Sequence, residues 1–173
     1  MTRTKSNNMV DDDFVPQPGA KQRPGLSLKA RAVALLSRRE HSRVELARKL
    51  APHAQDPDEI ARLLDQLEAK GWQSDTRYVQ GLVHRKSAVH GLARIAQSLK
   101  QQGISDTQIT EVRHQLKDTE IDRARSVWEK RFSAAGLPTN PGQYARQGRF
   151  LAARGFSHEV IHKILKNRLC DDQ

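Results

Sequence analysis

Apolar residues recur at intervals of three and four from Leu26 nearly to the end of the chain. That spacing places them along one side of an α-helix. No segment alternates apolar and polar residues for long, as a half-buried strand would. The first apolar stripe consists of Leu28, Ala32, Leu35 and Leu36, and later stripes have the same form. The pattern therefore predicts an all-α protein.

A short phrase that joins two helices occurs three times in this sequence. "AKGWQSD", "QQGISDT" and "ARGFSHE" each contain glycine, then a bulky apolar residue, then serine, and each glycine follows a leucine by four positions. Glycine readily takes the left-handed conformation after a helix, the apolar residue packs back on that helix, and serine caps the next helix. Three copies predict structural repeats in which leucines clasp Trp72, Ile104 and Phe156.

Start signals between these phrases divide the chain into three units of three helices. Ser42 and Glu45 have the spacing of a capping box, and Asp56 followed by Pro57 marks a further helix start. Residues 1–25 are turn-rich and weakly apolar, which predicts a disordered N-terminal tail. Units this small bury little surface alone, so we expect them to stack as an elongated, curved array. The expected units are residues 26–71, 72–116 and 117–168.

The composition indicates an acidic partner. The chain has 173 residues, with 36% hydrophobic and 5% aromatic residues, which suits helices around thin cores. Lysine and arginine total 30 against 20 aspartate and glutamate, giving a formal charge of +10. A charge of this size favours nucleic acid or another acidic surface.

The compartment is predicted from cysteine usage and from apolar runs. Cys170 is the single cysteine, so no internal disulfide is expected and a reducing compartment is indicated. The longest uninterrupted apolar run, 32–36, is far shorter than a membrane span, and the N-terminus has no apolar signal core. We therefore expect a cytoplasmic protein, monomeric and without a membrane partner.

The sequence offers no good case for catalysis, a cofactor or a metal. It contains no phosphate-binding glycine loop, no paired-cysteine metal spacing and no nucleophile elbow. His158 and His162 are four apart, as zinc ligands on a helix are, but no cysteine or suitably placed glutamate supports them. Surface histidines are the better interpretation, and no enzyme activity is expected.

The middle helices of the units are expected to be basic. In the second and third units they carry no acidic residue, and in the first Arg43, Arg48 and Lys49 accompany Glu45. These helices can present a broken basic stripe, although an ordinary solvated surface is an equally weighted alternative. The basic residues of the second and third middle helices are Arg94, Lys100, Arg146, Arg149 and Arg154.

A sequence-specific DNA reader is not expected, even though three-helix units suggest a helix-turn-helix. The third helix would enter the major groove, but in the first unit it carries Asp58, Glu59, Asp65 and Glu68. Those carboxylates would repel phosphates. Nonspecific phosphate contact with single- or double-stranded DNA remains compatible with the charge.

Four stretches of the chain resemble the RecX family of regulatory proteins. They run in the family's order across 30–167, although the turn at 88–95 keeps only Gly91 where the family usually has two glycines and a proline. Together the four matches are quite specific, whereas each alone is weak. The stretches are "ARAVALLSRREHSRVELARKL" (30–50), "LEAKGWQSDTRYV" (67–79), "GLARIAQSLKQQGIS" (91–105) and "RFLAARGFS" (149–157).

The resemblance implies a non-enzymatic negative regulator of the RecA recombinase. Family members bind in the deep helical groove of the RecA–DNA filament and restrain its ATPase, strand-exchange and repressor-cleavage activities. For Arg77, a structural role, pairing with Asp75 or capping a helix, is an equally weighted alternative to partner contact. The candidate contacts to the filament or to DNA are Arg77, Arg94, Lys100, Arg146, Arg149 and Arg154.

Two further hypotheses remain open at this point. One is a nonspecific DNA-binding protein that acts without RecA, and the other is a scaffold with a solvated basic surface. Salt-dependent DNA binding separates these two, because cations that contact phosphates release counterions. Dependence on a RecA filament separates the regulator from both.

Overall fold

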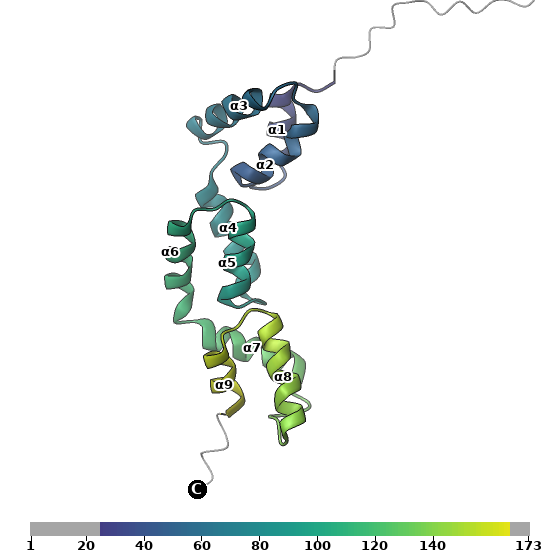
Figure 1. Ribbon diagram of the computed structural model, residues 1–173, viewed down its shortest axis with the longest axis vertical. Helices are drawn as coiled ribbons and strands as arrows, with labels where there is room; N and C mark the ends of the chain where they lie inside the picture. Colours follow the sequence, from purple (N-terminus) through teal and green to yellow (C-terminus); the bar gives the residue numbers. More distant parts are fainter. Residues whose placement is uncertain (1–24, 167–173) are drawn as a thin grey trace, which may run out of the picture.

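The computed structural model describes residues 25–166, which form nine α-helices and one short 3₁₀ helix (Figure 1). The all-α prediction is confirmed. The predicted disordered tail lies outside the described residues except for Gly25, and so does Cys170. The elements are α1 (Leu28–Leu36), α2 (Arg43–Leu50), η1 (Ala51–His53), α3 (Pro57–Ala69), α4 (Asp75–Ser87), α5 (Leu92–Gln101), α6 (Asp106–Lys117), α7 (Glu120–Phe132), α8 (Pro141–Ala153) and α9 (His158–Lys166).

Three sets of three helices each enclose their own hydrophobic cluster. We call them repeat 1 (α1–α3), repeat 2 (α4–α6) and repeat 3 (α7–α9). Fully buried side chains at their centres include Leu46 and Leu67 in repeat 1, Ile95 and Leu99 in repeat 2, and Leu151 in repeat 3. The exact limits of the units, including the extension to residue 168, stay a prediction.

The recurring glycine phrase has the predicted backbone geometry in all three places. Gly71, Gly103 and Gly155 have φ values of 68°, 73° and 85°, in the left-handed region that glycine tolerates. The serine of each phrase caps the next helix, because its hydroxyl accepts from a backbone N–H three residues on. The donors are Arg77, Gln108 and Val160, at 3.3 Å in each case.

The predicted hydrophobic clasp holds in two copies and is wrong in the first. Ile104 and Phe156 are 5% and 4% exposed, whereas Trp72 is 48% exposed. The backbone N–H of Trp72 still donates to Leu67 at 2.8 Å. Its neighbour Gln73 takes the buried place, because the Gln73 amide donates to His41 and Asp75. The indole is left outside, with Lys70 Nζ 6.0 Å from the ring centroid.

The repeats stack into an elongated array that is bowed, because repeat 2 lies to the left of the two outer repeats in Figure 1. The middle helices α2, α5 and α8 follow the right-hand, concave side, and α3, α6 and α9 follow the opposite side. The middle helices meet end to end: Gly155, just after α8, abuts Arg94 in the first turn of α5. Gly103, just after α5, abuts Val44 in the first turn of α2.

Candidate partner-binding surface

The two long sides of the array differ in charge. The third helices α3, α6 and α9 carry most of the acidic residues of the helices: Asp58, Glu59, Asp65, Glu68, Asp106, Glu111 and Glu159. The middle helices carry one, Glu45, which is 6% exposed and paired with Arg39. Their basic residues are Arg43, Arg48, Lys49, Arg94, Lys100, Arg146 and Arg149.

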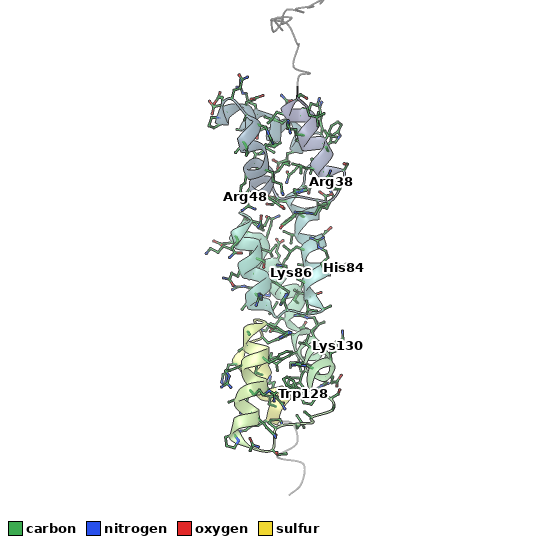
Figure 2. All side chains as sticks on the ribbon, turned by 90° about the vertical axis from the view of Figure 1, so that its right-hand side faces the viewer. Arg38, Arg48, His84, Lys86, Trp128 and Lys130 are labelled. Carbon is green, nitrogen blue, oxygen red and sulfur yellow. The ribbon has the colours of Figure 1, made fainter. Side chains whose placement is uncertain are left out.

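Cations are spread over the whole length of the concave side. Figure 2 looks onto this side, with Arg38 and Arg48 at the level of repeat 1, Lys86 at repeat 2 and Lys130 at repeat 3. Lys86 Nζ donates to Ser98 at 2.8 Å, whereas Arg38, Arg48 and Lys130 are exposed. We call the side formed by α2, α5 and α8, with these flanking cations, the concave basic face.

Besides Arg94, three of the six candidate residues are exposed on the middle helices. Lys100 lies in the last turn of α5, and Arg146 and Arg149 lie on α8. None of the three has an ion-pair partner among the residues that the structure describes. They are therefore available to an acidic partner.

The other three candidates are anchored by contacts within the protein, and two of them, Arg77 and Arg94, link neighbouring repeats. Arg77 Nε pairs with Glu40 at 2.6 Å, and its guanidinium donates to the carbonyls of Gly71 and Trp72 at 2.9 and 3.2 Å. The structural interpretation of Arg77 is therefore favoured, although its acidic partner is Glu40 and not Asp75.

Arg94 and Arg154 lie where repeat 2 meets repeat 3. Arg94 donates to the carbonyl of Ala153 at 2.6 Å, which ties the first turn of α5 to the end of α8. The guanidinium of Arg154 lies 3.7 Å from the centroid of the Phe150 ring. Both are anchored, but a guanidinium has five N–H donors, so each retains donors for a ligand.

Both junctions use a carboxylate from the first turn of the following repeat. Asp75 Oδ1 accepts from the N–H of Arg43 at 2.8 Å, and Glu120 Oε1 accepts from the N–H of Leu92 at 3.1 Å. Each acceptor caps the N-terminus of the preceding middle helix, where N–H groups lack partners and the helix dipole favours negative charge. The sequence analysis gave Glu120 no such role.

Arg123 is the second junction residue that the sequence analysis missed. It donates to the carbonyls of Ser87, His90 and Leu116 at 3.2, 2.9 and 3.1 Å. Burial lowers the pKa of Arg123, and Glu120 opposes that shift. Arg123 binds backbone carbonyls of repeat 2, as Arg77 binds the carbonyls that follow α3 at the end of repeat 1. The signal was a carboxylate followed two or three residues later by arginine, at the start of α4 and again of α7.

A partly buried charged cluster lies at the first junction. Arg39 binds Glu45 through both guanidinium nitrogens, with Nη1 to Oε2 at 2.9 Å. Burial acts to raise the pKa of Glu45, but its hydrogen bond from Arg39 and the nearby charges of His41, Arg39 and Lys49 outweigh burial and lower it. Burial lowers the pKa of His41, whose Nδ1 lies 3.0 Å from the Arg39 carbonyl. Glu45 therefore stays ionised inside the junction.

In the turn at 88–95, Gly91 allows the backbones of repeats 2 and 3 to come into contact. A Cβ atom at Gly91 would overlap the backbone of Gly155 and Phe156. The N–H of Gly91 donates to Arg154 at 2.9 Å, and that of Ala93 donates to Gly155 at 3.2 Å. The glycine that this chain retains is therefore the one that lets α8 reach α5.

Two absences apply to residues 25–166. No helix there is both long and apolar enough to cross a membrane. No group of three or more His, Cys, Asp or Glu side chains in the same range is placed to hold a metal ion.

Comparison with known proteins identifies the family. Residues 29–67 match the first three-helix domain of RecX, and residues 118–165 match the third. Regulatory protein RecX of Leptothrix cholodnii is 49% identical over 89% of this chain and 96% of its own length. The chain belongs to the RecX family. Regulatory protein RecX of Ralstonia nicotianae is 48% identical over 88% of this chain and 96% of its own length.

The RecX fold is shared at lower identity as well. The crystal structure of RecX from Lactobacillus salivarius is similar with a TM-score of 0.70 and 19% sequence identity. The similarity covers 81% of this chain and 93% of that one. The array of three-helix repeats is therefore the architecture of a RecX regulatory protein.

Proposed function

We propose that this chain is a negative regulator of the RecA recombinase, which binds the RecA–DNA filament and lowers its ATPase, strand-exchange and repressor-cleavage activities. The observation that carries the proposal is the concave basic face, which extends over all three repeats of a RecX-family chain. A filament presents the same subunit surface again and again, so an elongated array can contact more than one subunit. The proposed regulator acts in the cytoplasm as a monomer, without catalysis of its own.

The exposed cations supply attraction and orientation in this proposal. Lys100, Arg146 and Arg149 would meet acidic groups of the recombinase or DNA phosphates. Charge complementarity of this kind accelerates association and fixes the orientation of a partner. Arg77 and Arg94 would act mainly by fixing the shape of the array, because their side chains link neighbouring repeats, whereas Arg154 is anchored on Phe150 within repeat 3.

The test is DNA-dependent ATP hydrolysis by the RecA of the same organism, at substoichiometric and equimolar ratios of the regulator. One variant replaces an exposed cation on each middle helix: Arg48→Gln, Lys100→Gln and Arg149→Gln. Its matched control replaces one cation on each third helix: Arg62→Gln, Arg113→Gln and Lys166→Gln. Both remove three charges, and surface changes of this kind are usually mild for stability.

We expect the wild type and the control to inhibit hydrolysis and shorten filaments, and the concave-face variant to inhibit at least tenfold less strongly. No effect of the wild type at any ratio would refute the regulatory proposal. Equal inhibition by all three proteins would leave the regulation in place and exclude the concave face as the contact surface.

A nonspecific DNA-binding protein that acts without RecA is the second candidate, favoured by the charge of +10. Its binding would weaken steeply with salt and show little sequence preference. The two candidates separate when DNA binding is measured in the absence of RecA. Tight RecA-independent binding with no effect on ATP hydrolysis would select the second.

A further inference from the structure

A groove of about 490 Å³ lies where repeat 2 meets repeat 3. The α4–α5 turn, the first turn of α5, the second half of α7 and the end of α8 form its walls. Figure 2 shows Lys130 at this level of the array. We call it the junction groove, and its lining residues that matter here are His90, Arg94, Phe150, Lys130, Arg131 and Arg154.

The charge of the junction groove has one sign. Four cations line it, from α5, α7 and the end of α8, and no aspartate or glutamate is among its lining residues. Arg94, Lys130, Arg131 and Arg154 have no ion pair within the described part of the chain. Cations gathered without carboxylates repel one another, and a bound anion relieves that repulsion.

Two of these cations are held in place before any ligand arrives. Arg94 is fixed by the Ala153 carbonyl and Arg154 by the Phe150 ring, so neither has to be ordered on binding. His90 adds an unsatisfied group, because its Nδ1 is buried without a hydrogen-bond partner among the described residues. An anion accepts hydrogen bonds from the guanidinium groups, and from His90 Nδ1 when that nitrogen carries a proton.

We propose that the junction groove is a phosphate-binding site that takes two adjacent phosphate groups. Guanidinium groups match the geometry of phosphate oxygens in a two-point contact, and Lys130 adds a point charge. Four cations suit a diphosphate better than a single carboxylate. The two phosphates come either from a free nucleotide or from the backbone of a nucleic acid strand. This site goes beyond the proposed regulation of RecA and does not depend on it.

The first test is calorimetric titration of the full chain with inorganic pyrophosphate. The groove variant is Lys130→Gln with Arg131→Gln, and the matched control is Arg113→Gln with Lys166→Gln, which removes two exposed cations outside the groove lining and the concave basic face. We expect the groove variant to bind pyrophosphate at least tenfold more weakly than wild type, and the control to stay within threefold. Equal loss in both variants would reduce the effect to general electrostatics and overturn the proposal.

The titration of His90 is a second measurement, and cations bound to phosphate elsewhere on the surface would not change it. Burial lowers its pKa, and the charges of Arg94, Lys86 and Arg154 lower it further. Phosphate bound beside it favours the protonated ring, so its titration midpoint, followed by NMR, should rise when pyrophosphate is added. An unchanged midpoint at saturating pyrophosphate would contradict binding in this groove.

An oligothymidylate without terminal phosphates separates the two sources of phosphate. If the groove variant weakens binding of pyrophosphate alone, the ligand is a free nucleotide. If it weakens binding of both pyrophosphate and the oligonucleotide, the phosphates come from a strand backbone. Loss of oligonucleotide binding alone would contradict the proposal. If it weakens neither, no phosphate site exists here. RecA-dependent ATP hydrolysis measured on the same variants reports on the proposed regulation separately.

Discussion

The two junctions between repeats use the same kinds of residue but differ in the backbone contacts of their middle helices. In both, a first-turn carboxylate caps the preceding middle helix, and an arginine closes the preceding repeat. At the junction of repeats 2 and 3, two backbone N–H groups at the start of α5 also donate to the carbonyls of Arg154 and Gly155, just after α8. Between α2 and α5, within the described residues, no backbone hydrogen bond is made.

One position accounts for much of this difference. The N-cap of α2 is Ser42, whose hydroxyl accepts from the N–H of Glu45 at 3.0 Å. The N-cap of α5 is Gly91, which has no side chain to cap anything. Without a Cβ, Gly91 lets the end of α8 approach until its carbonyls serve as the cap. Among the described residues, the Ser42 side chain caps α2 without a backbone hydrogen bond from α5, whereas Gly91 leaves room for backbone carbonyls after α8 to bind the start of α5.

The first junction has buried polar side chains in place of backbone hydrogen bonds between its middle helices. His41, Ser42, Glu45 and Gln73 are all buried there, an unusual concentration for a chain of thin cores. Buried polar groups are stable only while every partner is present. We therefore infer that the first junction depends mainly on hydrogen bonds among buried polar side chains, and the second mainly on backbone fit.

The largest expected effect compares the two copies of the aromatic clasp. Phe156→Ala should lower the free energy of unfolding by about 3–5 kcal/mol, because its buried ring leaves a cavity in repeat 3. Trp72→Ala should lower it by less than about 1 kcal/mol, because the indole is largely exposed and gains mainly from Lys70. Urea unfolding of both variants measures the difference, and equal losses would place Trp72 in the core after all.

The next prediction compares the loss of stability when each of three glycines with a left-handed backbone is replaced by alanine. Gly155→Ala should destabilise by roughly 2–5 kcal/mol, since backbone strain adds to overlap with Arg94, whose N atom would lie 2.6 Å from the new Cβ. Gly103→Ala meets only the side chain of Val44, which can rotate, so its loss should be smaller.

Gly71→Ala is the matched control for that series, because its φ is 68° and nothing lies within 4 Å of the added Cβ. Its loss should reflect backbone strain alone, about 1–2 kcal/mol. The decrease in the urea midpoint should therefore be smallest for Gly71→Ala, larger for Gly103→Ala and largest for Gly155→Ala. An identical shift for all three would show that close approach at the second junction contributes nothing.

A smaller difference in stability is expected between variants of Arg123 and Arg77, the arginines at the two junctions. Arg123→Met should cost about 1.5–3 kcal/mol, because three carbonyls lose a charged donor in a half-buried site. Arg77→Met should cost below about 1 kcal/mol, since Arg77 and Glu40 are both partly solvated. Thermal unfolding of both variants tests the order, and a larger loss for Arg77 would reverse our ranking of the junctions.

Much of the local structure could be predicted from the sequence, because caps and glycine turns depend on residues within one turn of each other. Ser42, Asp56 and Gly103 behave as their neighbours in sequence require. Packing depended on more distant partners. The choice between Trp72 and Gln73 for the buried place depends in part on His41, 32 residues away, whose carbonyl accepts from the Gln73 amide. Periodicity carries no information about such a partner.

The candidate site was predicted in part for the same reason. Basic middle helices were visible in the sequence, and Lys100, Arg146 and Arg149 are exposed on them. That Arg94 is anchored to Ala153 follows from a contact across 59 residues, which no local pattern encodes. The groove cations Lys130 and Arg131 lie at the end of a first helix, outside the stripe that the sequence analysis followed.

The smallest expected effect is a difference in pH dependence between His41 and His90. Burial is the main cause that lowers the pKa of His41, the hydrogen bond to the Arg39 carbonyl and the charge of Glu45 oppose it, and the charges of Arg39 and Lys49 add to it. At His90 burial is followed by three cations and no acid. A histidine whose folded pKa is lowered stabilises fully above its unfolded value, about 6.5, and that contribution is lost as pH falls.

Both histidines should therefore destabilise the array between about pH 7 and pH 5, by roughly 1.4 kcal/mol for each unit that the pKa is lowered. His41→Gln and His90→Gln should each flatten the loss of melting temperature over that range, whatever they do at pH 7.5. Salt at 0.5 M should shrink the contribution of His90, because it screens the cations, and leave that of His41 largely unchanged, because burial is not screened. If salt affects both equally, the first junction is governed by solvent-exposed charge and its contrast with the second is lost.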